Sequence, residues 1–202
     1  YCDRTVEFIK EGDLKSAYAV FNELMFDPKD NVVLRLSGQR DHFSDIRNAE
    51  PASENFFETY LQQAWVRKAI HAGNRHYNQT SRKVGFPLQH DFMSSYRGEI
   101  DDLLQAGYEV LMYAGQLDII VNPVLMRAWI QHLEWEGTAE FLDSPQQIWR
   151  NRTDPENVLG YVSSHGPLTV AIVRTAGHMV PSDQPAAALD LITRFVRNDR
   201  YD

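Results

Sequence analysis

The sequence predicts an α/β fold built on a mostly parallel sheet, and three observations support this prediction. The apolar run Tyr108–Ala114 lies between Gly107 and Gly115, and such a run is typical of a strand that is buried on both faces. A second apolar run, Leu168–Arg174, predicts another strand. Apolar residues at helical spacing occur before, between and after these runs. Because doubly wound folds have more strands than these, we expect the chain to be the second half of a larger fold.

A helical hairpin and an irregular segment are predicted for the N-terminal part. Residues 3–26 carry apolar side chains every three to four positions, which favours helices. Gly12 can end the first helix and Asp13 can cap the second. Val32–Leu36 predicts a brief strand, and the polar stretch Ser37–Glu50 predicts a loop. Loops of that length often act as lids or binding loops.

One more helix is expected before the sheet. It would begin near a cap at Ser53 and stop at Gly73, and the polar residues 74–87 after it are expected to be exposed. The helix carries an aromatic cluster that we expect to contribute to the core, made of Phe56, Phe57, Tyr60 and Trp65.

Helices then alternate with the predicted strands. A helix is expected over Arg97–Gln105, ended by Gly107. Pro123 suits the first turn of a helix that runs to about His132, and Ile148–Arg150 predicts a short strand.

A hairpin and a final helix complete the chain. Asn157–Ser164 and Leu168–Arg174 flank His165-Gly166-Pro167, which is a hairpin pattern. Pro185 can begin the last helix. That helix has a broad apolar face, made of Ala188, Leu189, Leu191, Ile192, Phe195 and Val196.

Composition excludes some functions and favours one compartment. The 202 residues suffice for one domain, or a domain with an appendage, and the net charge of −8 argues against nucleic acid as a partner. No stretch is long and apolar enough to suggest a membrane span. The single cysteine, Cys2, and the glycosylation sequons at Asn78 and Asn151 favour a secreted or lysosomal location.

Two residues form the candidate catalytic pair. Asp118 follows the first predicted strand and His178 follows the second. If these strands lie side by side, their carboxyl ends bring the two side chains together. A histidine held in a constrained loop, after Gly177 and before Pro181, can act as a general base. The order Asp then His matches the last two members of the Ser–Asp–His triad of α/β-hydrolases.

The nucleophile of such a triad is missing from the sequence. No serine has glycine at both the −2 and +2 positions, as the Gly-x-Ser-x-Gly motif requires. There is also no histidine or cysteine set at metal-ligand spacing and no glycine-rich phosphate loop. We therefore expect no metal and no cofactor, and a serine supplied from outside these residues.

Three segments of the sequence resemble the serine carboxypeptidase family. They are Tyr-Ala-Gly-Gln-Leu-Asp-Ile-Ile-Val-Asn at 113–122, Ala-Gly-His-Met-Val-Pro at 176–181 and Trp-Val-Arg-Lys-Ala-Ile-His at 65–71. Asp183-Gln184-Pro185 before an apolar helix is similar to the family's C-terminus. Residues 116–121 look closest to the animal vitellogenic-like and retinoid-inducible branches.

The resemblance implies the C-terminal half of an α/β-hydrolase fold, with a mixed, mostly parallel sheet. Residues 1–92 would be the later part of a helical lid insertion and its return to the core, and residues 93–202 the C-terminal part of that core. Several members of the family mature as two disulfide-linked chains. Cys2 would then bridge to a large N-terminal chain of the same precursor, which would carry the serine and the oxyanion hole. The resemblance leaves room for a homodimer of this two-chain unit.

The resemblance also implies roles for individual residues. Asp118 would orient the imidazole of His178, which would move the serine's proton. Met179 and Asn122 would contact the peptide substrate, with Met179 lining the pocket for its last residue. Members of the family remove C-terminal residues one at a time, best at acidic pH, and use no metal. Glycans would be carried by Asn78 and Asn151.

Two departures from the family pattern accompany these matches. Thr175-Ala176 replaces a glycine that is common before the histidine motif, which we expect to affect only the turn. Val121 stands where fungal and plant members often have cysteine, and we expect this change to alter substrate preference.

Three functions stay open at this point. The first is an acid serine carboxypeptidase of which this is the smaller chain. The second is a carboxypeptidase-like protein that lacks the serine and acts by binding or stabilising a partner. The third is an acyltransferase on the same scaffold, with an identical triad.

Overall fold

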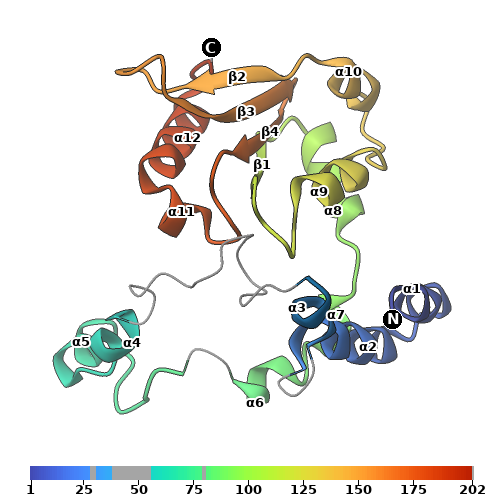
Figure 1. Cartoon of the computed structure of the whole chain (residues 1–202), viewed down its shortest axis with the longest axis vertical. Helices are drawn as coiled ribbons and strands as arrows, with labels where there is room; N and C mark the ends of the chain where they lie inside the picture. Colours follow the sequence, from blue (N-terminus) through green and yellow to red (C-terminus); the bar gives the residue numbers. More distant parts are fainter. Residues whose placement is uncertain (28–30, 38–55, 79–80, 202) are drawn as a thin grey trace. The chain divides into compact units, whose positions relative to one another are not determined.

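The computed structural model describes residues 1–27, 31–37, 56–78 and 81–201 of the chain. Among these residues, a first compact unit ends at Ser94 and a second begins at Ser95. The first unit is helical and the second contains the sheet (Figure 1). The predicted loop over 38–50 and the predicted cap at Ser53 lie outside the described residues.

The predicted helical hairpin at the start of the first unit is confirmed. Gly12, with a left-handed φ of 79°, ends its first helix, and Asp13 accepts a hydrogen bond from the Ser16 N–H (3.1 Å) to cap the second. The second helix also contacts two later helices. The helices described in this unit are α1 (Cys2–Glu11), α2 (Leu14–Phe26), α3 (Val32–Ser37), α4 (Phe56–Leu61), α5 (Ala64–Ala69), α6 (Arg82–Gly85) and α7 (Gln89–Phe92).

The strand predicted over Val32–Leu36 is wrong, because the segment forms helix α3. The side-chain oxygen of Asn31 accepts a hydrogen bond from the Leu34 N–H at 3.0 Å. Such a cap stabilises the first turn of a helix. Here it outweighs the preference of the two valines for extended backbone.

The single helix predicted up to Gly73 is also wrong within the described residues. It breaks between α4 and α5, where Gln63 has extended backbone with ψ of 135°. The predicted aromatic core is wrong as well, since all four aromatic side chains of the cluster are exposed. Of the residues in these two short helices, Val66 alone is buried, so they present their rings to the surface instead of enclosing them.

A four-stranded mixed sheet organises the second unit. Its order is β1-β4-β3-β2, with β1 and β4 parallel and the other two pairs antiparallel. The strands predicted in this unit and the hairpin at Gly166 are confirmed. Helices α10 and α11 were not predicted, because they are too short to show a helical periodicity in the sequence. The elements are α8 (Arg97–Gln105), β1 (Val110–Gly115), α9 (Pro123–Ile130), α10 (Thr138–Asp143), β2 (Gln147–Arg150), β3 (Val158–His165), β4 (Leu168–Val173), α11 (Val180–Asp183) and α12 (Pro185–Arg197).

Helices cover both faces of this sheet, which confirms the α/β class. On one face α11 and α12 enclose a core that includes Trp149 and Leu191, and on the other α8, α9 and α10 enclose a core that includes Ile130 and Leu168 (Figure 1). The predicted burial of β1 on both faces holds only at its end, Ala114 and Gly115. Its earlier residues are half-buried or exposed, because β1 is an edge strand of the described sheet.

Helix α12 packs with only part of the predicted apolar face, since Leu191 is buried and Ala188 packs against the core. It buries Ala187, Leu191 and Arg194, whereas Leu189 and Val196 of the predicted apolar face are exposed. None of the described helices is both long and apolar enough to cross a lipid bilayer.

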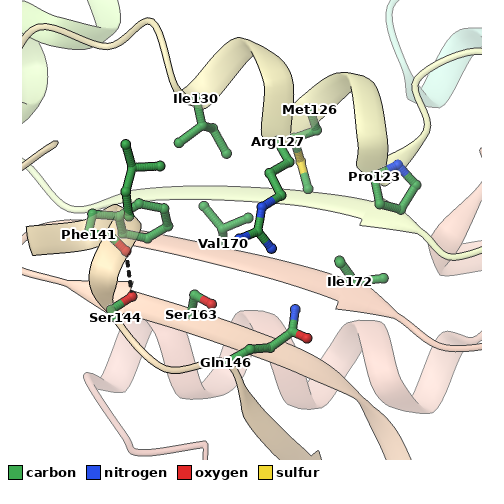
Figure 2. A pocket seen from close by; sticks show the side chains of 11 residues that line it. Pro123, Met126, Arg127, Ile130, Phe141, Ser144, Gln146, Ser163, Val170 and Ile172 are labelled. Atoms are coloured by element: carbon green, nitrogen blue, oxygen red, sulfur yellow. Dashed lines mark hydrogen bonds between the residues drawn. The ribbon is translucent and has the colours of Figure 1, made fainter. Parts of the chain in front are cut away.

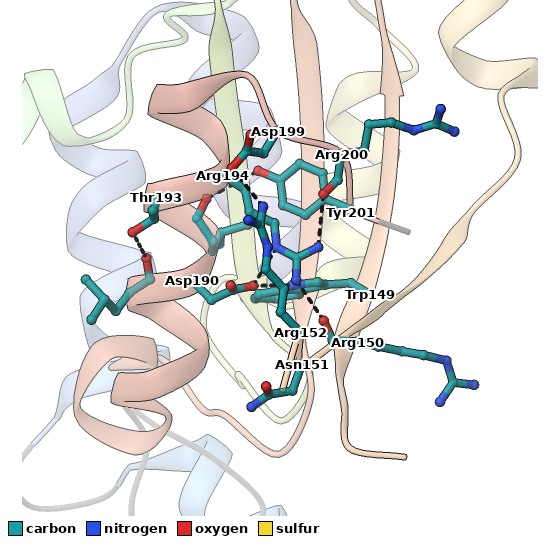
Figure 3. A network of polar contacts seen from close by, with 12 residues as sticks. Trp149, Arg150, Asn151, Arg152, Asp190, Thr193, Arg194, Asp199, Arg200 and Tyr201 are labelled. Carbon is teal, nitrogen blue, oxygen red and sulfur yellow. Dashed lines mark hydrogen bonds and ion pairs between the residues drawn. The ribbon is translucent and has the colours of Figure 1, made fainter. Parts of the chain in front are cut away.

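The buried arginine of α12 ties the C-terminus to the sheet (Figure 3). The Arg194 guanidinium lies 2.8 Å from the Asp190 carboxylate and donates hydrogen bonds to the carbonyls of Arg150 (2.8 Å) and Arg200 (2.9 Å). The indole N–H of Trp149 donates to the same Asp190 carboxylate at 2.8 Å. Buried charges are tolerated when they are paired and hydrogen-bonded in this way.

The free energy of unfolding of the whole protein should fall at alkaline pH because of the buried Tyr201. Burial raises the pKa of Tyr201 from 10 to about 12. The neutral phenol's contribution to the free energy of unfolding is complete below pH 10. It is lost as the pH rises towards 12, because the tyrosine ionises in the unfolded state at a lower pH than in the folded state. Calorimetric unfolding between pH 9 and pH 12 should show that stability falls less steeply with pH in Tyr201→Phe than in the wild type. The exposed Tyr108→Phe is the matched control, and equal slopes for all three proteins would contradict the prediction.

Candidate active site

The parallel pairing of β1 and β4 brings the two predicted catalytic loops together. Gly115, the last residue of β1, is in register with Val173, the last residue of β4. Asp118 lies three residues after the end of β1, and His178 lies five residues after the end of β4. The carboxyl ends of parallel strands share one edge of a sheet, where α/β proteins place their working residues.

The two loops are joined through their backbones. The Leu117 N–H donates a hydrogen bond to the Ala176 carbonyl at 2.8 Å. The approach requires glycine at position 115, because a Cβ there would lie 2.1 Å from the Gly177 carbonyl oxygen and 2.4 Å from that of Ala176. Gly115 is thus more than the end of a strand, since it sets the separation of the two loops.

Asp118 is buried and held from two sides. One carboxylate oxygen accepts hydrogen bonds from the N–H groups of Ile120 (2.8 Å) and Val121 (3.0 Å). The other oxygen lies 3.0 Å from Nδ1 of His178. Only 4% of the Asp118 side chain is exposed, so the carboxylate is fixed in orientation before any substrate binds.

His178 presents its second ring nitrogen away from this bond. Because the carboxylate accepts, Nδ1 carries the proton and Nε2 keeps a lone pair in the neutral ring. Among the described residues, no side chain or backbone group hydrogen-bonds Nε2. The side chain is 35% exposed. Asp118 and His178 therefore have the arrangement of a general base, and no serine hydroxyl among the described residues hydrogen-bonds the imidazole.

The other predicted site residues do not contact the Asp118–His178 pair through any hydrogen bond of the described residues. Met179 follows His178 and is 52% exposed. Asn122 caps α9, its side-chain oxygen accepting from the Leu125 N–H at 3.0 Å. Cys2 is an exposed free thiol in α1. Of the two sequon asparagines, Asn78 is exposed and Asn151 is half-buried.

The two sequons differ in local structure. Asn78 is exposed, and the sequon's threonine lies outside the described residues. The Asn151 side-chain oxygen accepts hydrogen bonds from both the N–H and the hydroxyl of Thr153, each at 2.9 Å. The second sequon is therefore a turn closed by its own side chains.

Other features of this part of the molecule lie apart from the pair. No group of three or more potential metal ligands occurs among the described residues. A pocket of about 120 Å³ lies between α9, α10 and the sheet, with Arg127 above Val170 and Ile172 (Figure 2). Neither Asp118 nor His178 lines it.

Residues that sequence reasoning did not assign to the site surround the His178 loop. Thr175, at the departure from the family pattern, has a φ of 55°, in the left-handed region that a β-branched residue rarely adopts. Its hydroxyl oxygen accepts a hydrogen bond from the Gln184 amide at 2.8 Å. Asp183 accepts from the Gly177 N–H at 2.7 Å. In the sequence, the family-like Asp183-Gln184 before Pro185 was the signal that could have pointed to these two residues.

The comparisons with known proteins show the family to which this chain belongs. Residues 8–198 match the family described as serine carboxypeptidase. The chain belongs to the serine carboxypeptidase family. It is 35% identical over 201 residues to a probable serine carboxypeptidase CPVL of Dictyostelium discoideum, covering all of this chain and 40% of that protein. It is 37% identical over 205 residues to the venom serine carboxypeptidase of Apis mellifera, again over the whole chain and 43% of that protein. The resemblance inferred from the motifs is confirmed.

A solved structure supports the fold. The chain superposes on a prohormone-processing carboxypeptidase from Saccharomyces cerevisiae with a TM-score of 0.66 and 20% identity, covering 95% of this chain and 47% of that one. This chain of the serine carboxypeptidase family thus spans about two fifths of the length of the curated relatives it matches and about half of the solved chain.

Proposed function

We propose that the whole protein is a serine-type carboxypeptidase, and that this chain supplies the aspartate and histidine of its triad. The observation that carries the proposal is the 3.0 Å contact between Asp118 Oδ2 and His178 Nδ1, with Nε2 left without a partner among the described residues. The serine would lie on a separate N-terminal chain of the same precursor, together with the oxyanion hole.

The proposed chemistry is acyl transfer through the serine. Nε2 of His178 takes the proton from the serine hydroxyl as the oxygen bonds to the carbonyl carbon of the last peptide bond. The imidazolium then gives this proton to the leaving amine as the C–N bond breaks. Water, deprotonated by the same nitrogen, then bonds to the acyl carbon, and the proton passes from the imidazolium to the serine oxygen as the acyl–oxygen bond breaks. Asp118 keeps the proton on Nδ1 and stabilises the imidazolium throughout.

Substrate contacts are proposed at two residues beside the pair. Met179 exposes its side chain next to His178, which suits an apolar wall for the substrate's last residue. Asn122 uses its side-chain oxygen to cap α9, so its amide NH₂ is the group we assign to the substrate. Val121 is exposed and follows Asp118 by three residues, and we propose that it affects substrate preference.

The exposed edge of the sheet supports docking of a serine-bearing chain. Within the described residues β1 pairs on one side only. An apolar groove of about 570 Å³ runs beside it, lined by Leu111, Met112, Tyr113, Val121, Leu125, Met126 and Trp129. Unpaired strand edges and large apolar surfaces rarely stay uncovered in stable proteins. We propose that residues 93–202 complete their core against that chain, and that residues 1–92 form part of the lid.

Processing, glycosylation and a secreted or lysosomal location complete the proposal. Cys2 is exposed and available to bridge to the large chain. Asn78 is exposed, and Asn151 lies half-buried in its turn; we assign a glycan to each. Mass analysis of the native protein should show a second chain that leaves on reduction and glycan mass on both asparagines. A native protein with neither the second chain nor the glycans would overturn this part of the proposal.

Substrate competition tests the function itself. The native protein, incubated with a blocked dipeptide and with an acyl-glucose ester, should release the C-terminal amino acid of the dipeptide, faster at acidic than at neutral pH. Consumption of the ester alone would instead support an acyltransferase. Consumption of neither would support a catalytically inactive binding protein.

A further inference from the structure

The loop that carries His178 closes on itself through a carboxylate. The Gly177 N–H donates a hydrogen bond to Asp183 Oδ2 at 2.7 Å, and the Asp183 N–H donates to the Met179 carbonyl at 3.0 Å. The single turn of α11 lies between these two bonds. Residues 177–183 therefore form a ring that contains His178 and has the Asp183 side chain as its closing link.

This closing bond acts on the backbone directly before the histidine. The imidazole has one hydrogen bond among the described groups, to Asp118, so its position depends on where the backbone of residues 177 and 178 is held. Gly177 is buried, and its N–H bonds to a side-chain carboxylate instead of a strand or helix carbonyl. Hydrogen bonds to carboxylates are stronger than those between neutral groups.

The opposite side of the same loop is held by different residues. The Ala176 carbonyl accepts from the Leu117 N–H (2.8 Å), which fixes it to the loop that carries Asp118. The Asp183 bond holds the other side of the same peptide group, because the Ala176 carbonyl and the Gly177 N–H belong to one amide. The peptide group between residues 176 and 177 is thus held from both sides, through its carbonyl by the β1 loop and through its N–H by the Asp183 carboxylate of α11.

We propose that Asp183 is a positioning residue for His178, acting through the Gly177 N–H, an inference that rests on the proposed function. Asp183 does not touch the imidazole in this role. It sets the backbone from which the imidazole reaches both Asp118 and the serine. Losing the bond lets the ring leave its productive position, and displacements of about 1 Å in an active site can cost about 100-fold in rate.

Kinetics of the whole protein test this role. Asp183→Ala should lower kcat by about 10- to 100-fold, with KM changed by less than about twofold. Asp183→Asn, which keeps an acceptor oxygen in the same place, should recover most of the rate. Asp183→Glu keeps the charge but moves the carboxylate by one methylene, so it should be slower than Asp183→Asn. If the alanine variant does not fold, this last comparison decides, and a glutamate variant as fast as the asparagine variant overturns the proposal.

Asp190→Ala is the matched control for a loss of stability alone. Asp190 is a carboxylate of the same C-terminal region, but it binds Trp149 and Arg194 instead of the His178 loop. Its alanine variant should have a lower Tm and a kcat within about twofold of the wild type. If Asp183→Ala lowers only Tm in the same way, Asp183 has a structural role and the positioning proposal is wrong.

A proton NMR signal separates this inference from the proposed function. The Nδ1 proton of His178, bonded to Asp118, should give a low-field resonance that disappears in His178→Ala. It should shift or broaden in Asp183→Ala and stay unchanged in Asp190→Ala. If the wild type hydrolyses no peptide, the proposed function fails, while this signal still reports the geometry. An unchanged resonance in a folded Asp183→Ala variant would overturn the positioning role.

Discussion

Replacing His178 by alanine in the assembled protein should reduce kcat for a blocked dipeptide by about 10⁶-fold, to the level left by substrate binding and the oxyanion hole. In the proposed mechanism His178 takes the serine's proton, since Nδ1 is bound to Asp118 and Nε2 has no hydrogen-bond partner among the described residues. Single-turnover kinetics with wild type and variant measure the effect directly.

The same substitution should leave the fold intact. The His178 side chain is partly exposed and makes one hydrogen bond. Asp118 keeps its bonds to the Ile120 and Val121 N–H groups when the imidazole is removed. Circular dichroism and Tm should therefore match the wild type closely. Full activity in the alanine variant would contradict the role assigned to His178. A lowered Tm would show that activity was lost through unfolding instead of through the missing imidazole.

Replacing Gly115 by alanine should have the second largest effect, although residue 115 itself does no chemistry. The added Cβ would lie 2.1 Å from one backbone oxygen and 2.4 Å from another, far inside normal contact. Both atoms belong to the His178 loop, and no flexible side chain is available to move away. The loops must separate, and overpacking of this kind costs about 1–3 kcal/mol or more. We expect kcat to fall by more than about 100-fold, together with a lower Tm.

Gly98→Ala is the matched control for the Gly115 substitution. Gly98 lies in α8, where an added Cβ meets no atom within 4 Å. Alanine favours a helix over glycine by about 1 kcal/mol, so this variant should be at least as stable as the wild type and equally active. Normal kinetics in Gly115→Ala would show that the two loops do not need their observed separation.

The candidate pair could be predicted from the sequence because parallel strands impose long-range order. Two apolar runs, each followed by a polar residue, placed Asp118 and His178 at the same edge of a sheet. The caps at Gly12 and Asp13 were predictable for a different reason, because capping depends on local backbone and side-chain chemistry alone. Pattern and motif together were therefore sufficient for the geometry of the pair.

Features that depend on tertiary context were not predictable in this way. The cap at Asn31 turned a valine-rich strand pattern into α3. The exposure of β1 follows from its place at the sheet edge, which a periodicity within the strand does not reveal. The bond from Gly177 to Asp183 joins a backbone N–H to a side chain across a single helical turn. Such a bond leaves no repeating pattern in the sequence.

Labelling of the native protein with a fluorophosphonate, followed by mapping of the modified residue, tests the central claim most directly. We predict that one serine outside these 202 residues is labelled, on a chain that separates on reduction, and that labelling is lost in His178→Ala. Labelling that is equally fast in the wild type and in His178→Ala would contradict the claim that the Asp118–His178 pair activates that serine. A native protein that is not labelled at all would contradict the proposed enzymatic function.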